Sequence, residues 1–280
     1  MKSQGIPLIK ERRFELLVDS LKCLNDNKYE RTRQIDCVLQ VYNKKTREYE
    51  KSIFRGIVIP TLGKLGLIVN YGRMVKPSEN GHLLIIAREL GEELYKAAKT
   101  QVIIDIDREM FGFMEVINGT GPNSKDVLLR LMDLSPPTSS EKQKRERVRN
   151  WLKILSANNL IIDSEDFITL NSETIWKCDS QSSKIVNMYA ELKGEILKGY
   201  SVLADRTYGI VDIEELRIIT SESCLKKYKL IVTRKVFDQI LGKVIKNETR
   251  LKITLGHSMG KGEKLFKLDG EYYRTIHIKG

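Results

Sequence analysis

Basic side chains at helical spacing are the residues of this sequence that could carry chemistry. Lys142, Arg145 and Arg149 lie three and four residues apart, so a helix would bring them to one face. Lysine and arginine hold phosphate groups, and arginine also reads the edge of guanine with two hydrogen bonds. Residues 142–149 contain five basic side chains, which predicts a surface for a polyanion. A helix face that is merely solvated would show the same spacing.

The chain around these basic residues has the period of an amphipathic helix. Its apolar residues recur at i, i+3, i+4 and i+7 and predict a buried face: Val148, Trp151, Leu152 and Leu155. Thr138, with Glu141 three residues later, predicts a capping-box start, and residues 157–159 predict the end. The sequence thus predicts a helix with one apolar and one basic face.

A β-hairpin is expected directly after this helix. Residues 160–162 and 167–170 are mostly apolar, and an acidic turn over residues 163–166 joins them. A helix that leads into a hairpin is the ending of a winged helix-turn-helix, in which the last helix can lie in the DNA major groove and the hairpin contacts the neighbouring backbone. The order of elements resembles winged-helix DNA-binding domains.

The same order of helices and hairpin is predicted at three places. We therefore expect an α+β fold, mostly α with small β-hairpins, built from tandem winged helix-turn-helix modules. Residues 1–105 would form the first module, 106–177 the second, 178–184 a linker, and 185–280 the third, with a long wing. Tandem modules let a monomer read a long DNA site that is not palindromic, although winged helices also serve as protein-interaction and spacer domains.

Periodicity and chain breakers predict the individual elements of each module. In the first module these are helices over 11–25 and 31–42, a polar turn over 43–51, a recognition region from residue 53, strands over 65–69 and 74–76, and a helix to about residue 98. The second module adds helices over 108–117 and 124–134. The third has a helix from residue 185, a short helix capped by Asp212, a helix over 234–244, and strands over 250–255 and 265–278 with a tight turn at Asp269 and Gly270.

Charge is distributed unevenly along the chain. The net charge is +11, with +6 in residues 1–105, −2 in residues 106–180 and +7 in residues 181–280, counted from the same sequence. A folded chain with a basic bias suits a polyanionic partner, of which nucleic acid is the commonest. Binding to anionic lipid, or a simple need for solubility, would produce the same bias.

Cysteine and histidine do not form a metal-binding pattern. The four cysteines lie without any C-x-x-C pair, and the three histidines complete no ligand set. We expect isolated buried thiols, no structural zinc and a reducing compartment. The first residues lack the apolar core of a signal peptide, and no run approaches the roughly 20 apolar residues of a membrane span. The protein is therefore expected in the cytoplasm.

Two aspartates and one short motif are the candidates for catalysis. Asp105 and Asp107 would face one side of a strand and could bind a metal, but Asp107 is better placed to cap the helix over 108–117. Glu191 and Lys193 match the letters E-x-K, with Asp179 upstream. The surrounding period is helical, which places residues two apart about 200° around the axis. We therefore expect no catalytic residue, no metal site and no cofactor.

The tandem arrangement resembles a known family through its central stretch, R-V-R-N-W-L-K-I-L-S-A-N-N-L-I-I-D-S-E-D-F-I-T-L. It looks like the DNA-recognition region of type IIS restriction endonucleases, in which successive winged-helix subdomains read an asymmetric site. The resemblance implies sequence-specific binding of double-stranded DNA in a restriction or defence system. It also implies a separate nuclease domain or subunit of the PD-(D/E)xK type as a partner, since no such domain is found here.

The expected DNA contacts are of two kinds. Arg145 and Arg149 would read guanine, while Lys142 and Lys153 would hold phosphates. The other candidates for DNA binding are Arg55, Lys64, Arg73, Lys144, Arg234, Lys235, Gln239, Lys243, Lys261 and Lys264. Two alternatives stay open. One is a complete restriction endonuclease with an unrecognised active site, which would require magnesium. The other is a replication initiator or transcription regulator.

Overall fold

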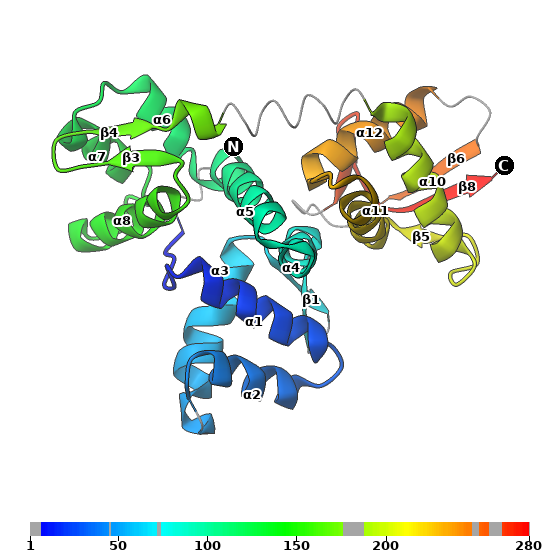
Figure 1. Cartoon of the computed structure of the whole chain (residues 1–280), viewed down its shortest axis with the longest axis horizontal. Helices are drawn as coiled ribbons and strands as arrows, with labels where there is room; N and C mark the ends of the chain where they lie inside the picture. Colours follow the sequence, from blue (N-terminus) through cyan, green and yellow to red (C-terminus); the bar gives the residue numbers. More distant parts are fainter. Residues whose placement is uncertain are drawn as a thin grey trace. The chain divides into compact units, whose positions relative to one another are not determined.

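The computed structural model describes residues 7–44, 46–71, 74–175, 188–247, 252–257 and 265–279. Over these residues the chain is mostly helical with small antiparallel sheets (Figure 1), which confirms the predicted α+β class. The chain divides into two compact units. The first comprises Met1–Ile85 and Lys99–Cys178, and the second comprises Ile86–Ala98 and Asp179–Gly280. The first unit therefore contains most of the first two predicted modules.

The first unit begins with helices followed by a hairpin. The elements are α1 (Phe14–Asp26), α2 (Arg31–Val41), the 3-10 helix η1 (Arg47–Tyr49), the π-helix η2 (Glu50–Val58), α3 (Ile59–Lys64), and the antiparallel strands β1 (Ile68–Tyr71) and β2 (Met74–Pro77). Both helices before residue 42 are confirmed. The predicted polar turn over 43–51 is wrong in part, because helical structure resumes at Arg47. The first strand begins at Ile68 rather than at residue 65, because α3 and its turn extend to Gly66.

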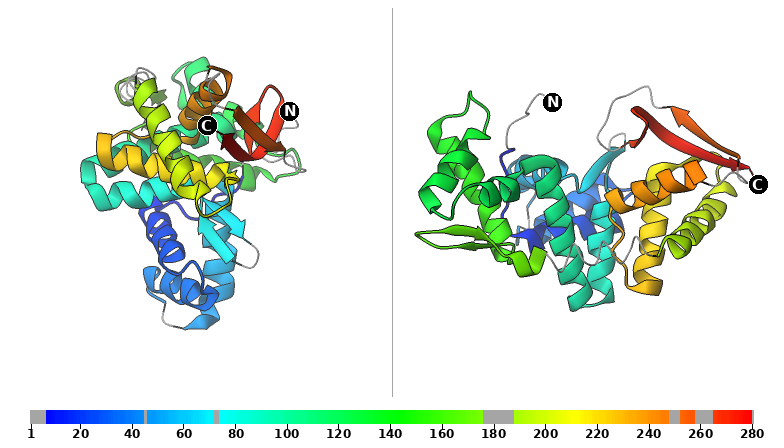
Figure 2. Two further views of the ribbon diagram at one scale, coloured as in Figure 1. Left: turned by 90° about the vertical axis from the view of Figure 1, so that its right-hand side faces the viewer. Right: turned by 90° about the horizontal axis from the view of Figure 1, so that it is seen from above.

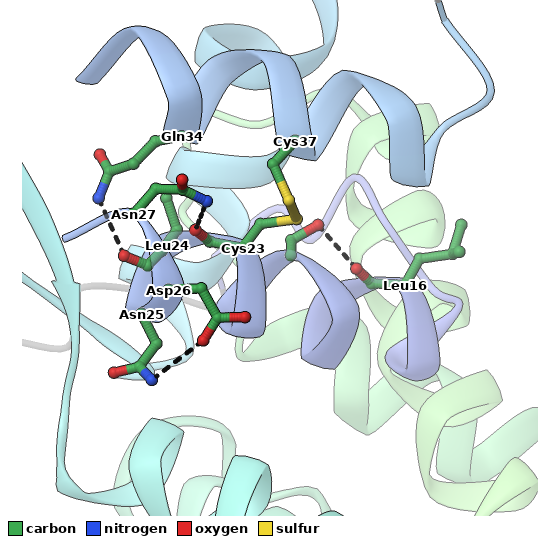
Figure 3. Close-up of a disulfide and its surroundings, with 9 residues drawn as sticks. Leu16, Cys23, Leu24, Asn25, Asp26, Asn27, Gln34 and Cys37 are labelled. Carbon is green, nitrogen blue, oxygen red and sulfur yellow. Dashed lines mark hydrogen bonds between the residues drawn. A yellow bond between two sulfur atoms is a disulfide. The ribbon is translucent and has the colours of Figure 1, made fainter. Parts of the chain in front are cut away.

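Two contacts join α1 to α2. The buried amide of Gln34 donates to the carbonyl oxygens of Leu24 at 3.1 Å and Val75 at 2.8 Å, so it connects α2 to both α1 and β2. The sulfur atoms of Cys23 and Cys37 form a disulfide between the two helices (Figure 3). The prediction of isolated thiols is therefore wrong for this pair, because sequence spacing does not show which faces of two helices meet. Cys224 is a buried free thiol, as predicted.

A glycine divides the helix that follows β2. Helix α4 covers Glu79–Leu90, and α5 covers Glu92–Ile106. Gly91 between them has φ +135, a conformation that favours glycine. The predicted single helix to residue 98 is therefore wrong in two respects: it is interrupted, and it extends to residue 106. The apolar stretch before Asp107 is helical, so Asp105 and Asp107 do not lie at alternate strand positions.

Three helices and a second hairpin complete the first unit. After the π-helix η3 (Asp107–Phe111) come α6 (Phe113–Gly119), α7 (Ser124–Asp133), α8 (Glu141–Ala157), and the paired strands β3 (Ile161–Asp163) and β4 (Ile168–Leu170). The basic helix, its end and its hairpin are confirmed. Its start is corrected: Ser140 and Gln143 form the capping box, because Thr138 lies in a turn closed by the hydrogen bond from Ser139 N to Pro136 O.

Asp107 is the polar centre of this part of the core. Its carboxylate accepts hydrogen bonds from Trp151 Nε1 at 2.6 Å and from the backbone amide of Met114 at 2.9 Å. The prediction that Asp107 caps a helix over 108–117 is wrong, because helical structure already runs through Asp107 in η3 and α6 begins only after Gly112. Asp107 instead satisfies a backbone amide in the first turn of α6. Burial raises the pKa of Asp107, against the effect of these hydrogen bonds. Trp151 also stacks on Phe111, with 4.0 Å between the ring centroids.

The second unit packs three helices against a sheet. Besides Ile86–Ala98, which belong to α4 and α5, its elements are α10 (Tyr189–Ala204), β5 (Val211–Asp212), α11 (Ile213–Tyr228), α12 (Arg234–Asn247), β6 (Lys252–His257), β7 (Phe266–Leu268) and β8 (Glu271–Lys279). The strand order is β5-β8-β6, and β7 also pairs with β8. The strands lie on one side of the helices (Figure 2). Leu216, Phe237, Phe266 and Ile276 are among the side chains of the core between them.

In the second unit, the predicted helix cap and tight turn are found in the structure, but the predicted length of one helix is wrong. The Asp212 carboxylate accepts from the amides of Glu214 and Glu215, which confirms the cap, but α11 runs to Tyr228 and is not short. Asp269 and Gly270 have positive φ values between the paired residues Leu268 and Glu271, which confirms the tight turn. The linker predicted over 178–184 lies outside the described residues.

Replacing Asp107 tests its place in the core. Asp107→Ala would leave the Trp151 and Met114 donors buried without acceptors, each at a cost of about 1–3 kcal/mol. We expect this variant to lower the free energy of unfolding by about 2–5 kcal/mol, measured by urea titration followed by tryptophan fluorescence. Asp166→Ala, at an exposed turn position, is the control and should change stability little. Equal stability of the two variants would contradict this assignment.

Candidate functional site

A groove in the first unit collects basic side chains from two separate segments of the chain. It has a volume of about 670 Å³, and most of its lining comes from the exposed face of α8. The remainder comes from the segment that precedes α1. The lining residues are Lys10, Arg12, Glu141, Lys142, Arg145, Glu146, Arg149, Asn150 and Lys153. Six of these are basic and two are acidic, so the groove has the charge of an anion-binding surface.

Two hydrogen bonds, one of them buried, hold the segment over 7–13 against α8 and α3. Asn150, on α8, donates from Nδ2 to the carbonyl oxygen of Ile9 at 2.7 Å, and both residues are buried. Lys64, at the end of α3, donates from Nζ to the carbonyl oxygen of Leu8 at 3.2 Å. Backbone carbonyls removed from water require such partners. The segment is therefore fastened to two helices that are far apart in the sequence.

The same segment presents two exposed cations to the groove. Lys10 uses one of its ammonium hydrogens on the carbonyl oxygen of Gly56 at 3.0 Å, which leaves two donors. The guanidinium of Arg12 makes no hydrogen bond or ion pair with any residue that the structure describes. The buried carboxylate of Glu11 accepts from the backbone amides of Arg12 and Arg13 and fixes the turn into α1. Both charged groups therefore extend from a fixed backbone.

The positive charge of the α8 face is only partly neutralised. Arg145 forms an ion pair with Glu141 one turn earlier on the same helix. Lys142, Arg149 and Lys153 are exposed and have no ion-pair partner within the described part of the chain. An anion in the groove would therefore meet cations that are not already paired.

Like charges also lie close together beside the groove. Burial, together with the nearby charges of Arg147 and Lys10, lowers the pKa of Lys64. Lys64 is a predicted DNA-binding residue, but its ammonium group bonds to the backbone of Leu8. Its main effect on the site is therefore to position the segment over 7–13.

None of the other predicted residues that the structure describes lines the groove. Arg55 forms an ion pair with Glu50 at 2.6 Å, and Lys144 is partly buried outside the groove lining. Arg234 is turned toward its own unit, since it bonds to Leu265 O and approaches Asp238 at 3.8 Å. Three candidates lie together on the exposed face of α12: Lys235, Gln239 and Lys243. Three others lie outside the described residues: Arg73, Lys261 and Lys264.

Sequence reasoning missed five members of the groove: the acidic residues Glu141 and Glu146, and Lys10, Arg12 and Asn150. Lys10 and Arg12 belong to the run K-E-R-R before the first helix, which carries no periodicity that could be assigned to a site. Asn150 has one recognisable signal. It is a polar residue between the apolar positions Val148 and Trp151 of an amphipathic helix, and such a residue needs a partner if it is buried. The partner, the carbonyl oxygen of Ile9, is 141 residues away in the sequence and could not be identified from local spacing.

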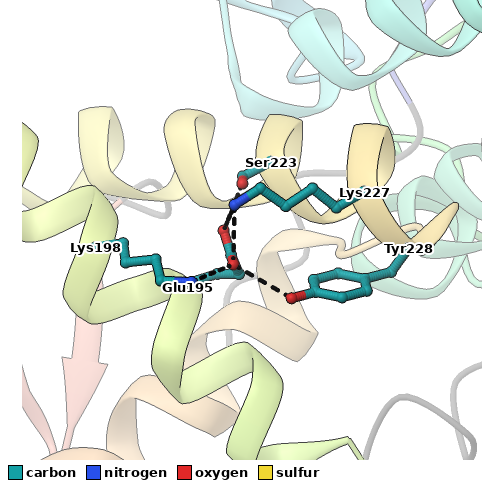
Figure 4. A network of polar contacts seen from close by, with 5 residues as sticks. All are labelled: Glu195, Lys198, Ser223, Lys227 and Tyr228. Atoms are coloured by element: carbon teal, nitrogen blue, oxygen red, sulfur yellow. Dashed lines mark hydrogen bonds and ion pairs between the residues drawn. The ribbon is translucent and has the colours of Figure 1, made fainter.

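A second polar cluster surrounds Glu195 on α10. Its carboxylate accepts from Lys227, Ser223 and Tyr228 on α11 and pairs with Lys198 one turn later (Figure 4). Burial acts to raise the pKa of Glu195, but the bonds from Lys227, Ser223 and Lys198 outweigh it and lower the pKa to about 2. A carboxylate that stays ionised and fully partnered at neutral pH is poorly suited to proton transfer. We infer that this cluster stabilises the packing of α10 against α11 in the second unit.

The Glu195 cluster should make the free energy of unfolding depend on pH. A pKa lowered from 4.5 to about 2 corresponds to about 3 kcal/mol. This contribution is present above pH 4.5 and is lost as the pH falls toward 2, because the unfolded chain takes up the proton first. We expect Glu195→Gln to be less stable than the unaltered chain at pH 7, with a difference that shrinks below pH 4.5. Urea unfolding at several pH values measures it.

The control for this experiment is Glu191→Gln, because Glu191 is an exposed carboxylate on the same helix. Its effect on stability should be small at every pH. A Glu195→Gln deficit of constant size from pH 7 to pH 2.5 would contradict the proposed charge network.

The hydrogen bond between Asn150 and Ile9 gives a second prediction. Asn150→Ala leaves a buried carbonyl without a donor, at a cost of about 1–3 kcal/mol. We expect amide hydrogen exchange over residues 7–13 to accelerate more than exchange in α6. Asn158→Ala is the matched control, since Asn158 bonds only within its own helix, to Ile154 O at 2.7 Å. If both variants leave exchange over 7–13 unchanged, Asn150 does not hold the segment.

Metal and membrane features are absent from the residues that the structure describes. These residues form no cluster of three or more histidine, cysteine or acidic side chains that could bind a metal. None of their helices is long and apolar enough to cross a membrane. Comparison with protein-family models, with curated proteins and with solved structures found no match to this chain. The site is therefore defined by its own geometry: a basic groove between α8 and a fastened segment.

Proposed function

We propose that the chain binds double-stranded DNA in a sequence-specific manner, with the groove on α8 as its main contact surface. The observation that carries the proposal is a set of exposed cations on one helix face that have no ion-pair partner among the described residues: Lys142, Arg149 and Lys153. Phosphate neutralisation supplies much of the affinity of a DNA-binding protein, and base-edge contacts supply its specificity. A role in a restriction or defence system rests on the resemblance to type IIS recognition regions alone.

The order of elements supports tandem winged-helix modules. In the first unit, α1, α2 and α3 precede the hairpin β1–β2, and α6, α7 and α8 precede the hairpin β3–β4. In the second unit, α10, α11 and α12 precede β6 and β8, while β5 adds a third strand. In a winged helix the last helix before the hairpin is the one that enters the major groove. By that rule α8 is the recognition helix of its module.

The roles of the α8 side chains follow from their pairing. Arg149 is exposed and has no ion pair with the residues that the structure describes, so it can approach guanine O6 and N7 without losing such a contact. Arg145 must first leave Glu141, which makes it the weaker reader. Lys142 and Lys153 lie at the two ends of the basic face and suit phosphates on either side of the groove. This ranking refines the sequence-based expectation, in which both arginines were equal.

Replacing Arg149 tests the proposal. Loss of a bidentate contact costs about 1–3 kcal/mol of discrimination, so Arg149→Ala should relax the preference at one position of a site selected from a random duplex pool. Arg130→Ala is the control, because Arg130 is exposed on α7 and does not line the groove. Unchanged site preference and affinity in Arg149→Ala would remove α8 from the interface.

The same selection with magnesium tests the nuclease alternative, which predicts cleavage near the selected site.

A further inference from the structure

The hairpin that follows α8 has the wrong charge for DNA. The end of β3 and the turn to β4 carry three exposed acidic side chains, Asp163, Glu165 and Asp166. Residues 161–170 contain no lysine or arginine. Carboxylates brought to a phosphate backbone are repelled, and no cation of the hairpin offsets that repulsion. The usual contact of a wing with the backbone beside the recognition helix is therefore disfavoured in this module.

The segment over 7–13 has the charge that the hairpin lacks. Lys10 and Arg12 are exposed, line the same groove as α8 and extend from a backbone that is fastened at Leu8 and Ile9. Cations on a fixed backbone lose little conformational freedom when they bind phosphate, which favours affinity. A basic arm beside a recognition helix is a known way to add DNA contacts.

The groove also indicates where along α8 the DNA would lie. Its lining runs from Glu141 to Lys153, the N-terminal and middle turns of the helix. The hairpin follows the C-terminal end of α8 and contributes no residue to the groove. The hairpin also exposes two apolar side chains, Ile162 and Phe167. The hairpin is therefore not part of the groove in which phosphates would be held.

We propose that the segment over 7–13, through Lys10 and Arg12, holds the DNA backbone beside α8, and that the hairpin β3–β4 does not contact the DNA. This inference rests on the proposed function. It adds a contact segment from the opposite end of the unit's sequence and removes the wing from the interface. In this arrangement Asn150 is a positioning residue, since its bond to Ile9 O sets the place of both cations relative to α8.

Charge-neutral variants of the full chain test the inference. Each phosphate contact contributes about 0.9 to the slope of log K against log salt. We expect the double variant Lys10→Gln and Arg12→Gln to lower that slope by roughly 1.8 and to weaken binding by at least about fivefold near 0.1 M salt. Neutralising the hairpin with Asp163→Asn, Glu165→Gln and Asp166→Asn should change affinity less than about twofold. The double variant Lys125→Gln and Arg130→Gln removes two exposed cations on α7 outside the groove; it is the charge-matched control and should leave the slope unchanged.

The outcomes separate the two proposals. The inference is overturned if the Lys10→Gln and Arg12→Gln double variant has the same slope of log K against log salt as the unaltered chain. It is also overturned if neutralising the hairpin strengthens binding about tenfold or more, because that is the result expected of a wing that contacts the phosphate backbone. If the unaltered chain binds no duplex at low salt, the proposed function fails instead. All the replaced side chains are exposed, and thermal unfolding of each variant checks that the fold is retained.

Discussion

A single buried hydrogen bond, from Asn150 Nδ2 to the carbonyl oxygen of Ile9, is the constraint on which the groove depends. It joins a segment before the first helix to the middle of α8. The bond from Lys64 to Leu8 O adds a second point of attachment, on α3. Because both carbonyls belong to consecutive residues, the backbone between them has little freedom. The two wall segments of the groove are therefore fixed relative to each other before any ligand arrives.

The basic surface of α8 arises from where charged residues are placed, and not from the total charge of residues 106–180. Residues 106–180 are acidic overall, yet α8 presents cations on one face while acidic side chains gather at the hairpin turn. The arm adds Lys10 and Arg12 to the cationic side. Asp107 and Glu195 are the opposite case. Their carboxylates are enclosed by hydrogen bonds and hold helices together rather than facing a ligand.

Local patterns predicted the elements well, because helices and hairpins follow from short-range periodicity. The basic face of α8, the hairpin after it, the Asp212 cap and the turn at Asp269 and Gly270 all depend on residues a few positions apart. The start of α8 was predicted wrongly because two residue pairs could each form the capping box. Thr138 with Glu141 and Ser140 with Gln143 have the same capping spacing, and only the turn at Pro136 decides between them.

Long-range contacts could not be predicted from the sequence. The disulfide between Cys23 and Cys37, the bond from Trp151 to Asp107 and the attachment of the arm each require two elements to be packed against each other first. The basic face of α8, which supplies most of the candidate site, was therefore predicted. The contribution of the segment over 7–13, with Lys10 and Arg12, becomes visible only when the fold brings that segment beside α8.

The central claim is that the α8 groove is a surface for duplex DNA. It is tested most directly by the affinity of the full chain for random-sequence duplex DNA over a series of salt concentrations. Four phosphate contacts, from Lys10, Arg12, Lys142 and Lys153, predict a slope of log K against log salt of about −3 to −4. Binding with such a slope would support the claim. A chain that binds no duplex even at low salt, or whose binding does not respond to salt, would contradict it.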